Sequence, residues 1–257
     1  YGLSKYIKLN DHELYQKDYG VTIKGICDFD LEHIFECGQC FRWNKIKENY
    51  YIGVVNGEVI SVEFTGDTLD IFNVSLERVV NVWYDYFDLG TDYSQIKKKL
   101  SIDSVMKEAI AKGEGIRILK QDLYEVIISF IISANNFIPR IKKIIERICI
   151  TCGNKMNYLN EVFYSFPNVE TLLKATTEDI DFWKAGFRSK YILGASQILL
   201  ENQSLNNLLD LETLEVKKKL IELPGVGPKV SDCILLYGMR RTEVFPTDVW
   251  VKRVIEE

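Results

Sequence analysis

The chain has 257 residues, enough for a sizeable core and for one or two domains. Apolar residues make up 47% and aromatic residues 12%, a composition that excludes an intrinsically disordered chain. The net charge of −5 argues against a nonspecific nucleic-acid binder, so a DNA-binding surface would need a local concentration of basic side chains.

No apolar run in the sequence is long enough to span a membrane. The longest, around residues 126–132, has about a third of the residues that a spanning helix needs. No secretory or transit segment opens the chain. We therefore expect no membrane association. The chain starts at Tyr1 without a methionine and stops at Glu257 inside an amphipathic pattern, and we expect it to be truncated at its C-terminal end.

The six cysteines indicate reduced thiols more than a metal site. Two C-x-x-C pairs, Cys37/Cys40 and Cys149/Cys152, lie more than a hundred residues apart. A zinc site assembled across that separation is the alternative. We favour buried, reduced cysteines in a cytosolic compartment.

The first marked stretch is CGQCFRW at residues 37–43. A glycine among apolar and aromatic residues is typical of a strand entry with a bulge, and by itself the stretch favours that structural role. Further along, alternating apolar residues over 50–74 predict an antiparallel sheet. Asn56-Gly57 between two apolar runs is a strong hairpin signal within it.

Helical spacing replaces the alternation from Ser75 onward, and further short helices are predicted over 93–100 and 103–112. Two glycines then break the chain. These elements predict an α+β fold. We expect an N-terminal α+β domain with an antiparallel sheet over residues 1–115 and a mostly α-helical domain over 116–257.

The second half begins with a helix that is apolar on all sides and is therefore expected to be buried. Asp122 is placed to cap its start, and Pro139 suits the first turn of the next helix. That helix has an isoleucine core stripe. Three basic side chains lie beside the stripe within about sixty degrees, as on a helix that follows DNA phosphates: Arg140, Lys143 and Arg147.

A capping-box pattern at Thr176 predicts the start of another helix, and Gly186 is typical of its end. Phe187 and Arg188 follow directly. An exposed aromatic residue beside an arginine after a helix end is typical of a wedge that unstacks a DNA base step. The alternative for Phe187 is an ordinary hydrophobic contact at the helix end.

The stretch LPGVGPKVSDC at residues 223–233 predicts a tight hairpin between two helices, with the whole motif over 213–238. Free backbone N–H groups at the start of the second helix form an anion site. We expect four residues to bind DNA phosphate there: Gly225, Gly227, Lys229 and Val230.

The charge around this hairpin is locally basic. Residues 217–241 contain six lysines and arginines against Glu222 and Asp232. A basic surface of this kind attracts DNA phosphates. For the lysine run at 217–219, a solvated helix face is the alternative.

Two features together resemble the helix-hairpin-helix superfamily of base-excision DNA glycosylases: the hairpin with Lys229, and Asp248 in FPTDVW nineteen residues later. Within that superfamily, GQCFRW resembles the 8-oxoguanine DNA glycosylases, and so does SANNFIPRI at residues 133–141. The resemblance covers most of the chain. It implies a DNA glycosylase with AP lyase activity whose partner is double-stranded DNA with a damaged base.

The resemblance also implies which residues bind the damaged base. The carbonyl of Gly38 would accept a hydrogen bond from N7–H of 8-oxoguanine, a donor that guanine lacks. Cys233 would pack against a face of the base, although a small core residue is the alternative.

A second group would hold the opposite strand. Asn135 would fill the gap left by the flipped base, Arg140 and Arg188 would contact the cytosine, and Phe187 would be the wedge. The alternatives are a helix C-cap for Asn135 and a surface position for Arg140. Bulky residues between Asn135 and Arg140 depart from the family pattern, as does phenylalanine in place of the more usual tyrosine at 187.

Lys229 is the expected nucleophile. A partly buried lysine at a helix N-terminus is expected to have a lowered pKa, and a neutral amine forms Schiff bases. After base flipping, Lys229 would attack C1′ and the Schiff base would permit β-elimination of the 3′-phosphate. Asp248 would stabilise positive charge on the sugar. The alternative for Asp248 is a helix N-cap, and one carboxylate can fill both roles.

We expect no cofactor, and the fold of the resembled family allows a monovalent cation at the hairpin carbonyls. We expect a monomer in the cytoplasm or nucleoid, or in the nucleus of a eukaryote. Two alternatives stay open: a glycosylase of the same superfamily for another damaged base, and a noncatalytic hairpin module that binds DNA. The closing helix of the resembled family, which completes the base pocket, would lie beyond Glu257.

Overall fold

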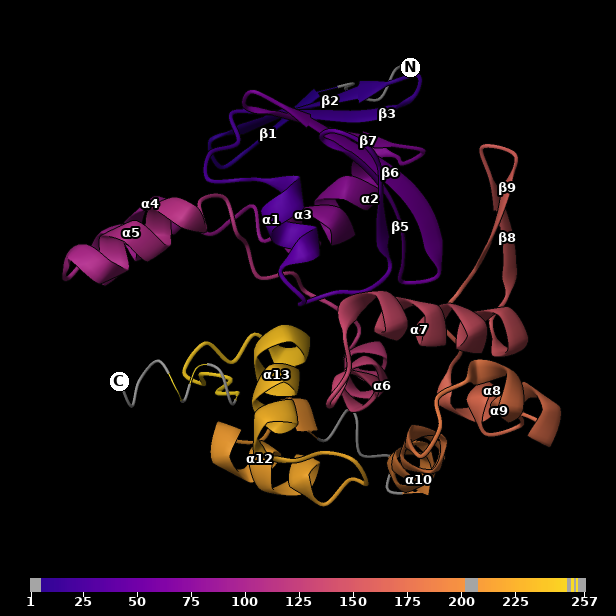
Figure 1. Ribbon diagram of the computed structural model, residues 1–257. Coiled ribbons are helices and arrows are strands. Elements are labelled where there is room, and N and C mark those ends of the chain that lie inside the picture. The colour runs from indigo at the N-terminus through magenta and orange to yellow at the C-terminus, as the bar shows by residue number, and fades with distance from the viewer. Residues whose placement is uncertain (1–5, 202–207, 249–250, 252, 254–257) are drawn as a thin grey trace. The chain divides into compact units, whose positions relative to one another are not determined.

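The computed structural model describes residues 6–201, 208–248, 251 and 253 (Figure 1). The chain forms two compact units, the first of Tyr1–Gly53 and Val59–Lys120 and the second of Val54–Glu58 and Gln121–Glu257. The division falls at Lys120, near the expected boundary after residue 115. A β-rich first unit and a helical second unit confirm the α+β fold class.

The first unit is built on a seven-stranded sheet with the order β1-β2-β3-β7-β6-β5-β4. Its strands are β1(Tyr6–Leu9), β2(His12–Lys17), β3(Gly20–Lys24), β4(Trp43–Lys47), β5(Tyr50–Val55), β6(Glu58–Thr65) and β7(Thr68–Phe72). The predicted hairpin is confirmed between β5 and β6. Asn56 and Gly57 both have positive φ, 51° and 74°, as a two-residue turn of this hand requires.

The strands before α1 were not predicted. β1 has mostly exposed side chains, so its sequence lacks the alternation by which a half-buried strand is identified. β3 has the opposite property, because four of its five residues are buried and both of its faces are covered. Neither pattern has period two.

Six helical segments complete the first unit: α1(Leu31–Glu36), α2(Leu76–Arg78), the π-helical turn η1(Val79–Trp83), α3(Tyr84–Tyr86), α4(Tyr93–Leu100) and α5(Ser104–Lys112). The helices predicted over 93–100 and 103–112 are confirmed as α4 and α5. Asp92 and Asp103 cap them by accepting backbone hydrogen bonds at the N-termini.

Trp43, at the end of the GQCFRW run, belongs to the core of the first unit. Its ring stacks on Phe35 with 4.2 Å between centroids and 13° between planes. Its indole Nε1–H donates to the hydroxyl of Tyr86 at 2.8 Å. A Cβ at Gly53 would lie 2.4 Å from the indole, so only glycine leaves room for it. The predicted strand entry is confirmed at Trp43, whereas Gly38 lies earlier, in the turn after α1.

Helices dominate the second unit: α6(Leu123–Ser133), α7(Ile138–Cys152), α8(Val169–Leu172), α9(Thr177–Trp183), α10(Arg188–Glu201), α12(Thr213–Ile221) and α13(Pro228–Met239). One hairpin, β8(Lys155–Tyr158) with β9(Glu161–Tyr164), interrupts them. Asp122 caps α6, whose residues are nearly all buried, and Pro139 lies in the first turn of α7, as predicted.

The capping box at the start of α9 is confirmed. The side chain of Thr176 accepts a hydrogen bond from the backbone N–H of Asp179, and the side chain of Asp179 accepts one from the backbone N–H of Thr176. The predicted end of that helix at Gly186 is wrong. α9 ends at Trp183, and Lys184 takes the left-handed conformation with φ 55°. Gly186, with φ 61°, shapes the following turn into α10.

Arg117 joins separate loops of the first unit. Its buried guanidinium donates to the carbonyls of Cys27 at 2.7 Å, Asp28 at 2.9 Å and Asp88 at 2.6 Å. The ring of Tyr93 lies 4.5 Å from the guanidinium carbon. Because buried carbonyls need a donor, one side chain satisfies backbone groups that no strand or helix reaches.

We predict that Arg117→Met destabilises the protein by about 3 kcal/mol, because several buried carbonyls lose their donor together. Urea-induced unfolding followed by circular dichroism measures the change. Lys120→Met is the matched control, since Lys120 makes only an exposed ion pair with Asp85 and its loss should cost less than about 0.5 kcal/mol. Equal effects of the two substitutions would contradict this role of Arg117.

Candidate active site

The turn between α12 and α13 depends on one glycine. Gly225 has φ 83°, and a Cβ there would lie 2.9 Å from the Cβ of Tyr191 on α10. Gly227 is the N-cap of α13 and Pro228 is its first residue. The N–H groups in the first turn of a helix have no partner within the helix, so those of Lys229 and Val230 are available to an anion.

Lys229 lies in this first turn, half-buried against apolar and aromatic groups. Its Nζ is 5.9 Å from the centroid of the Phe130 ring, which itself stacks on Tyr237. The thiol of Cys233, one turn further along α13, lies close enough for the positive charge of Lys229 to act on it. Within the part of the chain that the structure describes, Lys229 makes no ion pair with a carboxylate.

Cys233 is buried beside this amine. Burial raises the pKa of its thiol, and the positive charge of Lys229 only partly offsets that effect. The negative charges of Asp232 and Asp248 also act on the thiol. Cys233 is therefore a neutral, soft surface next to the lysine at neutral pH.

Asp248 is half-buried, and its Oδ1 accepts a hydrogen bond from the backbone N–H of Val251 at 2.9 Å. This is the contact of a helix N-cap, so the structural alternative for Asp248 is observed. Because its charge also acts on the Cys233 thiol, the structure brings Lys229, Cys233 and Asp248 into one neighbourhood.

Asp232 has a different partner from the one that its position suggests. It lies three residues after Lys229, a spacing at which opposite charges on a helix can pair. Its side chain is 12% exposed and instead pairs with Lys217 on α12, at 2.7 Å between Oδ1 and Nζ. Lys217 therefore joins the two helices of the motif, whereas its neighbours Lys218 and Lys219 are exposed.

A second group of expected site residues surrounds the loop between α6 and α7. Arg188 is only 3% exposed, and its Nη2 donates to the carbonyls of Ala134 at 2.6 Å and Asn135 at 2.9 Å. Its guanidinium also lies 4.5 Å from the centroid of the Phe187 ring. Burial, followed by the charge of Arg140, lowers the pKa of Arg188. The structure thus brings all four expected opposite-strand residues together.

The contact of Arg188 with this loop was missed by the sequence interpretation, which gave it only a DNA contact. The capping alternative for Asn135 fits the structure, because Asn135 follows the C-cap Ala134 of α6 in the left-handed conformation that is typical after a helix end. The side-chain hydrogen bond to the helix end comes from Asn136, which donates to Ile132 at 3.1 Å. Asn135 itself is exposed in the left-handed conformation, with φ 50°. Its side chain has no hydrogen-bond partner among the described residues.

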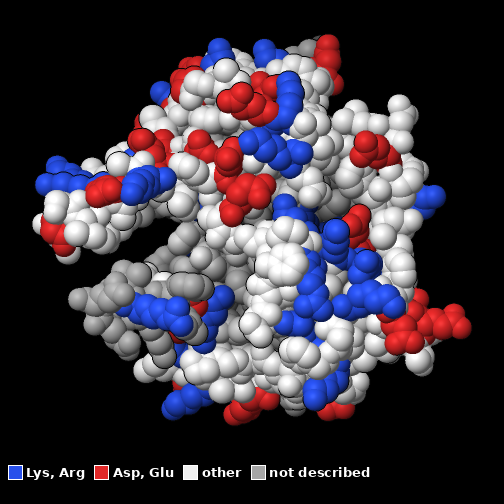
Figure 2. All heavy atoms as spheres, in the orientation of Figure 1, with Lys and Arg blue, Asp and Glu red and all other residues white. Residues whose placement is uncertain are grey.

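Exposed aromatic rings lie next to cations around this loop. Phe187 is 59% exposed, and Phe137 and Arg140 are exposed as well. Lys143 is exposed one turn further along α7, and the guanidinium of Arg147 packs on Phe182. Figure 2 shows lysine and arginine side chains crowded together around α7, whereas the first unit shows mixed signs. Exposed aromatic and basic side chains together suit a nucleic acid.

Gly38 belongs to the first unit. It follows α1 with φ 86°, a conformation that favours glycine, and it is partly exposed. The next residue, Gln39, is 1% exposed and makes several hydrogen bonds. The sequence interpretation assigned no role to Gln39.

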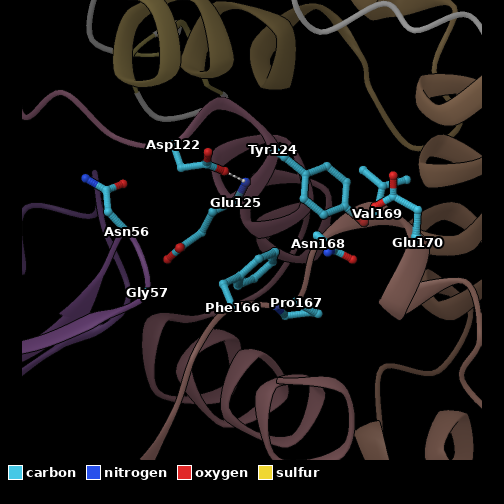
Figure 3. A pocket seen from close by; sticks show the side chains of 10 residues that line it. All are labelled: Asn56, Gly57, Asp122, Tyr124, Glu125, Phe166, Pro167, Asn168, Val169 and Glu170. Atoms are coloured by element: carbon cyan, nitrogen blue, oxygen red, sulfur yellow. Dashed lines mark hydrogen bonds between the residues drawn. The ribbon is translucent and has the colours of Figure 1, made fainter. Parts of the chain in front are cut away.

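A pocket of about 490 Å³ in the second unit contains none of the expected site residues (Figure 3). Three of the side chains that line it are acidic: Asp122, Glu125 and Glu170. One of them is already occupied, because Asp122 accepts the capping hydrogen bond from the backbone of Glu125. An acidic lining repels phosphates, so this pocket is not a candidate for binding DNA.

The described residues contain no group of three or more His, Cys, Asp or Glu side chains that could hold a metal ion. The cation expected at the hairpin carbonyls stays a prediction. No helix in the described part of the chain has the length and apolar character needed to cross a membrane.

Comparison with known families divides the chain in two. Residues 23–127 match the model of the 8-oxoguanine DNA glycosylase N-terminal domain. Residues 128–257 match the model of the HhH-GPD superfamily of base excision DNA repair proteins.

Solved structures and curated proteins give the same result. MBOgg1 bound to a low affinity DNA ligand is 45% identical, with a TM-score of 0.92 over 96% of this chain and 86% of that one. The Clostridium acetobutylicum 8-oxoguanine glycosylase/lyase, bound to duplex DNA with cytosine opposite 8-oxoguanine, is 39% identical with a TM-score of 0.91, over 98% and 85% of the two chains. A probable N-glycosylase/DNA lyase of Methanothermobacter thermautotrophicus is 29% identical over 89% of this chain and 82% of its own length.

Lys217→Met should destabilise the protein by about 2 kcal/mol, because it leaves the buried carboxylate of Asp232 without its partner on α12. Adding Asp232→Asn removes the uncompensated charge, and the double variant should recover at least half of the lost free energy of unfolding. Urea-induced unfolding of the parent, both single variants and the double variant measures this coupling. Additive losses would show that the pair does not stabilise the motif.

Proposed function

Because the chain belongs to the HhH-GPD superfamily of base excision DNA repair proteins and carries an 8-oxoguanine DNA glycosylase N-terminal domain, we propose that it excises 8-oxoguanine opposite cytosine and then nicks the strand as a β-lyase. The observation that carries the proposal is the position of Lys229 in the first turn of α13, beside Cys233 and without a carboxylate partner among the described residues. The Clostridium acetobutylicum relative, bound to this lesion pair, supports the choice of base.

The proposed reaction begins with a flipped nucleotide. The Lys229 amine attacks C1′, the N-glycosidic bond breaks, and the base leaves with the bonding electrons and takes up a proton. Asp248 stabilises the positive charge that develops on the sugar. The C1′–O4′ bond then breaks, O4′ takes up a proton, and C1′ is left double-bonded to Nζ as a protonated Schiff base. Loss of a C2′ proton then breaks the C3′–O bond and releases the 3′-phosphate.

The other expected residues hold the DNA. We assign phosphate binding to the backbone N–H groups of Lys229 and Val230 and to the glycine turn before them, Gly225 to Gly227. We assign contact with the cytosine, and the filling of the gap left by the flipped base, to four residues: Asn135, Arg140, Arg188 and Phe187. Gly38 accepts from N7–H of the lesion, and Cys233 packs on its face.

Another damaged base is less well supported, because the match over residues 23–127 is to the N-terminal domain of 8-oxoguanine glycosylases. A noncatalytic hairpin module would not need Lys229 or Asp248. We further propose that the protein acts as a monomer where the genome is, in the nucleoid or nucleus.

Borohydride should trap a covalent complex between the protein and an 8-oxoguanine:cytosine duplex, because it reduces the Schiff base. Lys229→Gln should abolish the trapped complex and lower base excision by at least about a thousandfold, since it removes the nucleophile. Gel analysis of the trapped complex and of the nicked strand measures both effects. Lys219→Gln, a change at an exposed lysine of α12, should leave both unchanged. Base release without trapping by the parent protein would exclude the lyase step.

Arg140→Ala should reduce the preference for cytosine opposite the lesion by about tenfold or more, because a side chain that donates to the acceptor edge of cytosine is lost. Single-turnover excision from duplexes with each of the four opposite bases measures the preference. Lys143→Ala, one turn along the same exposed row, should weaken binding to all four duplexes equally. An unchanged preference in Arg140→Ala would remove Arg140 from the residues that contact cytosine.

A further inference from the structure

The side chain of Gln39, next to Gly38, is hydrogen-bonded at both its nitrogen and its oxygen. Its Nε2 donates to the carbonyl of Ile34 at 2.9 Å and to the carbonyl of Arg117 at 2.8 Å. Its Oε1 accepts from the backbone N–H of Leu119 at 3.0 Å. With 1% of its surface exposed, this amide would be costly to bury if those bonds were not made.

The hydrogen bonds of the Gln39 amide reach two different parts of the first unit. Ile34 lies in α1, directly before the turn that contains Gly38. Arg117 and Leu119 lie in a segment that is itself fixed, because the Arg117 guanidinium donates to carbonyls in two loops and the backbone N–H of Ile118 donates to the hydroxyl of Tyr93 at 2.9 Å. The side chain of Gln39 therefore ties the turn after α1 to a rigid support.

This connection acts on the carbonyl of Gly38 through covalent geometry. The oxygen of Gly38 lies in the planar peptide group whose other end is the nitrogen and Cα of Gln39. Gly38 itself, with φ 86° and no side chain, places little restriction on that plane. The direction of the carbonyl is thus set by the residue that follows it.

We propose that Gln39 is a positioning residue that fixes the direction of the Gly38 carbonyl, and that it thereby determines how strongly 8-oxoguanine is preferred over guanine. The inference rests on the proposed function. The two bases differ at N7, where only the lesion carries a hydrogen, and a single acceptor distinguishes them only if its lone pair points at that hydrogen.

Two substitutions test the role of Gln39. Gln39→Met keeps the length of the side chain and removes its hydrogen bonds to Ile34, Arg117 and Leu119. Gln39→Glu keeps an acceptor for Leu119 and loses both donors, so it provides a second variant if the first does not fold. In each, we expect the ratio of kcat/KM for 8-oxoguanine to that for guanine, both opposite cytosine, to fall at least tenfold.

Cleavage of a preformed abasic site distinguishes positioning from general damage. This reaction needs Lys229 and the grip on DNA but no damaged base, so both variants should retain it within about twofold of the parent rate. Ser61→Ala is the matched control for loss of a buried hydrogen bond in the same unit, because Ser61 is fully buried and accepts from the Tyr50 hydroxyl at 2.8 Å. It should leave the ratio unchanged.

The possible failures are distinguishable. If the parent protein shows no preference for 8-oxoguanine over guanine, the proposed function fails and this inference fails with it. If the parent prefers the lesion and both folded variants keep the parent ratio, Gln39 does not set the preference. If abasic-site cleavage falls in parallel with excision, the role of Gln39 is structural and the inference is overturned.

Discussion

An amine that is held by a carboxylate stays protonated, so the amine of Lys229 must have no such partner if it is to attack a sugar. Within the described part of the chain, the packing of α12 against α13 keeps the nearest acid of the helix from pairing with Lys229. Asp232, three residues after Lys229, is the nearest acid along the helix, and its charge is paired with Lys217 across the motif. Lys229 is left against Phe130 and Cys233, in the first turn of a helix. The helix-hairpin-helix motif thus positions the nucleophile as well as the backbone groups that bind phosphate.

The hairpin and the helix caps could be predicted because they depend on neighbouring residues. The turn at Gly225 needs a positive φ, and the caps at Asp122 and Thr176 are satisfied within four residues. The helical spacing that flanks the hairpin is equally local. Lys229, Asp248 and Cys233 were therefore identifiable as candidates, since one short motif and one downstream aspartate place them near each other.

The hydrogen bonds from buried side chains that hold the site residues in place were not predictable, because they join residues far apart in the sequence. Gln39 bonds to Arg117 across 78 positions, and Arg188 bonds to Ala134 across 54. A glutamine inside a glycine turn, or an arginine after a helix end, gives no signal of a buried backbone partner. Strands β1 and β3 escaped prediction for a different reason, because their burial does not alternate. The sequence pattern does not indicate which polar side chains are buried.

The central claim is that Lys229 is the amine that bonds to the sugar. Tandem mass spectrometry of the borohydride-trapped complex, after digestion of protein and DNA, locates the reduced sugar adduct on one residue. We expect the adduct on Nζ of Lys229 and on no other lysine of the chain. An adduct on another amine, such as Lys217 or Lys190, would contradict the account.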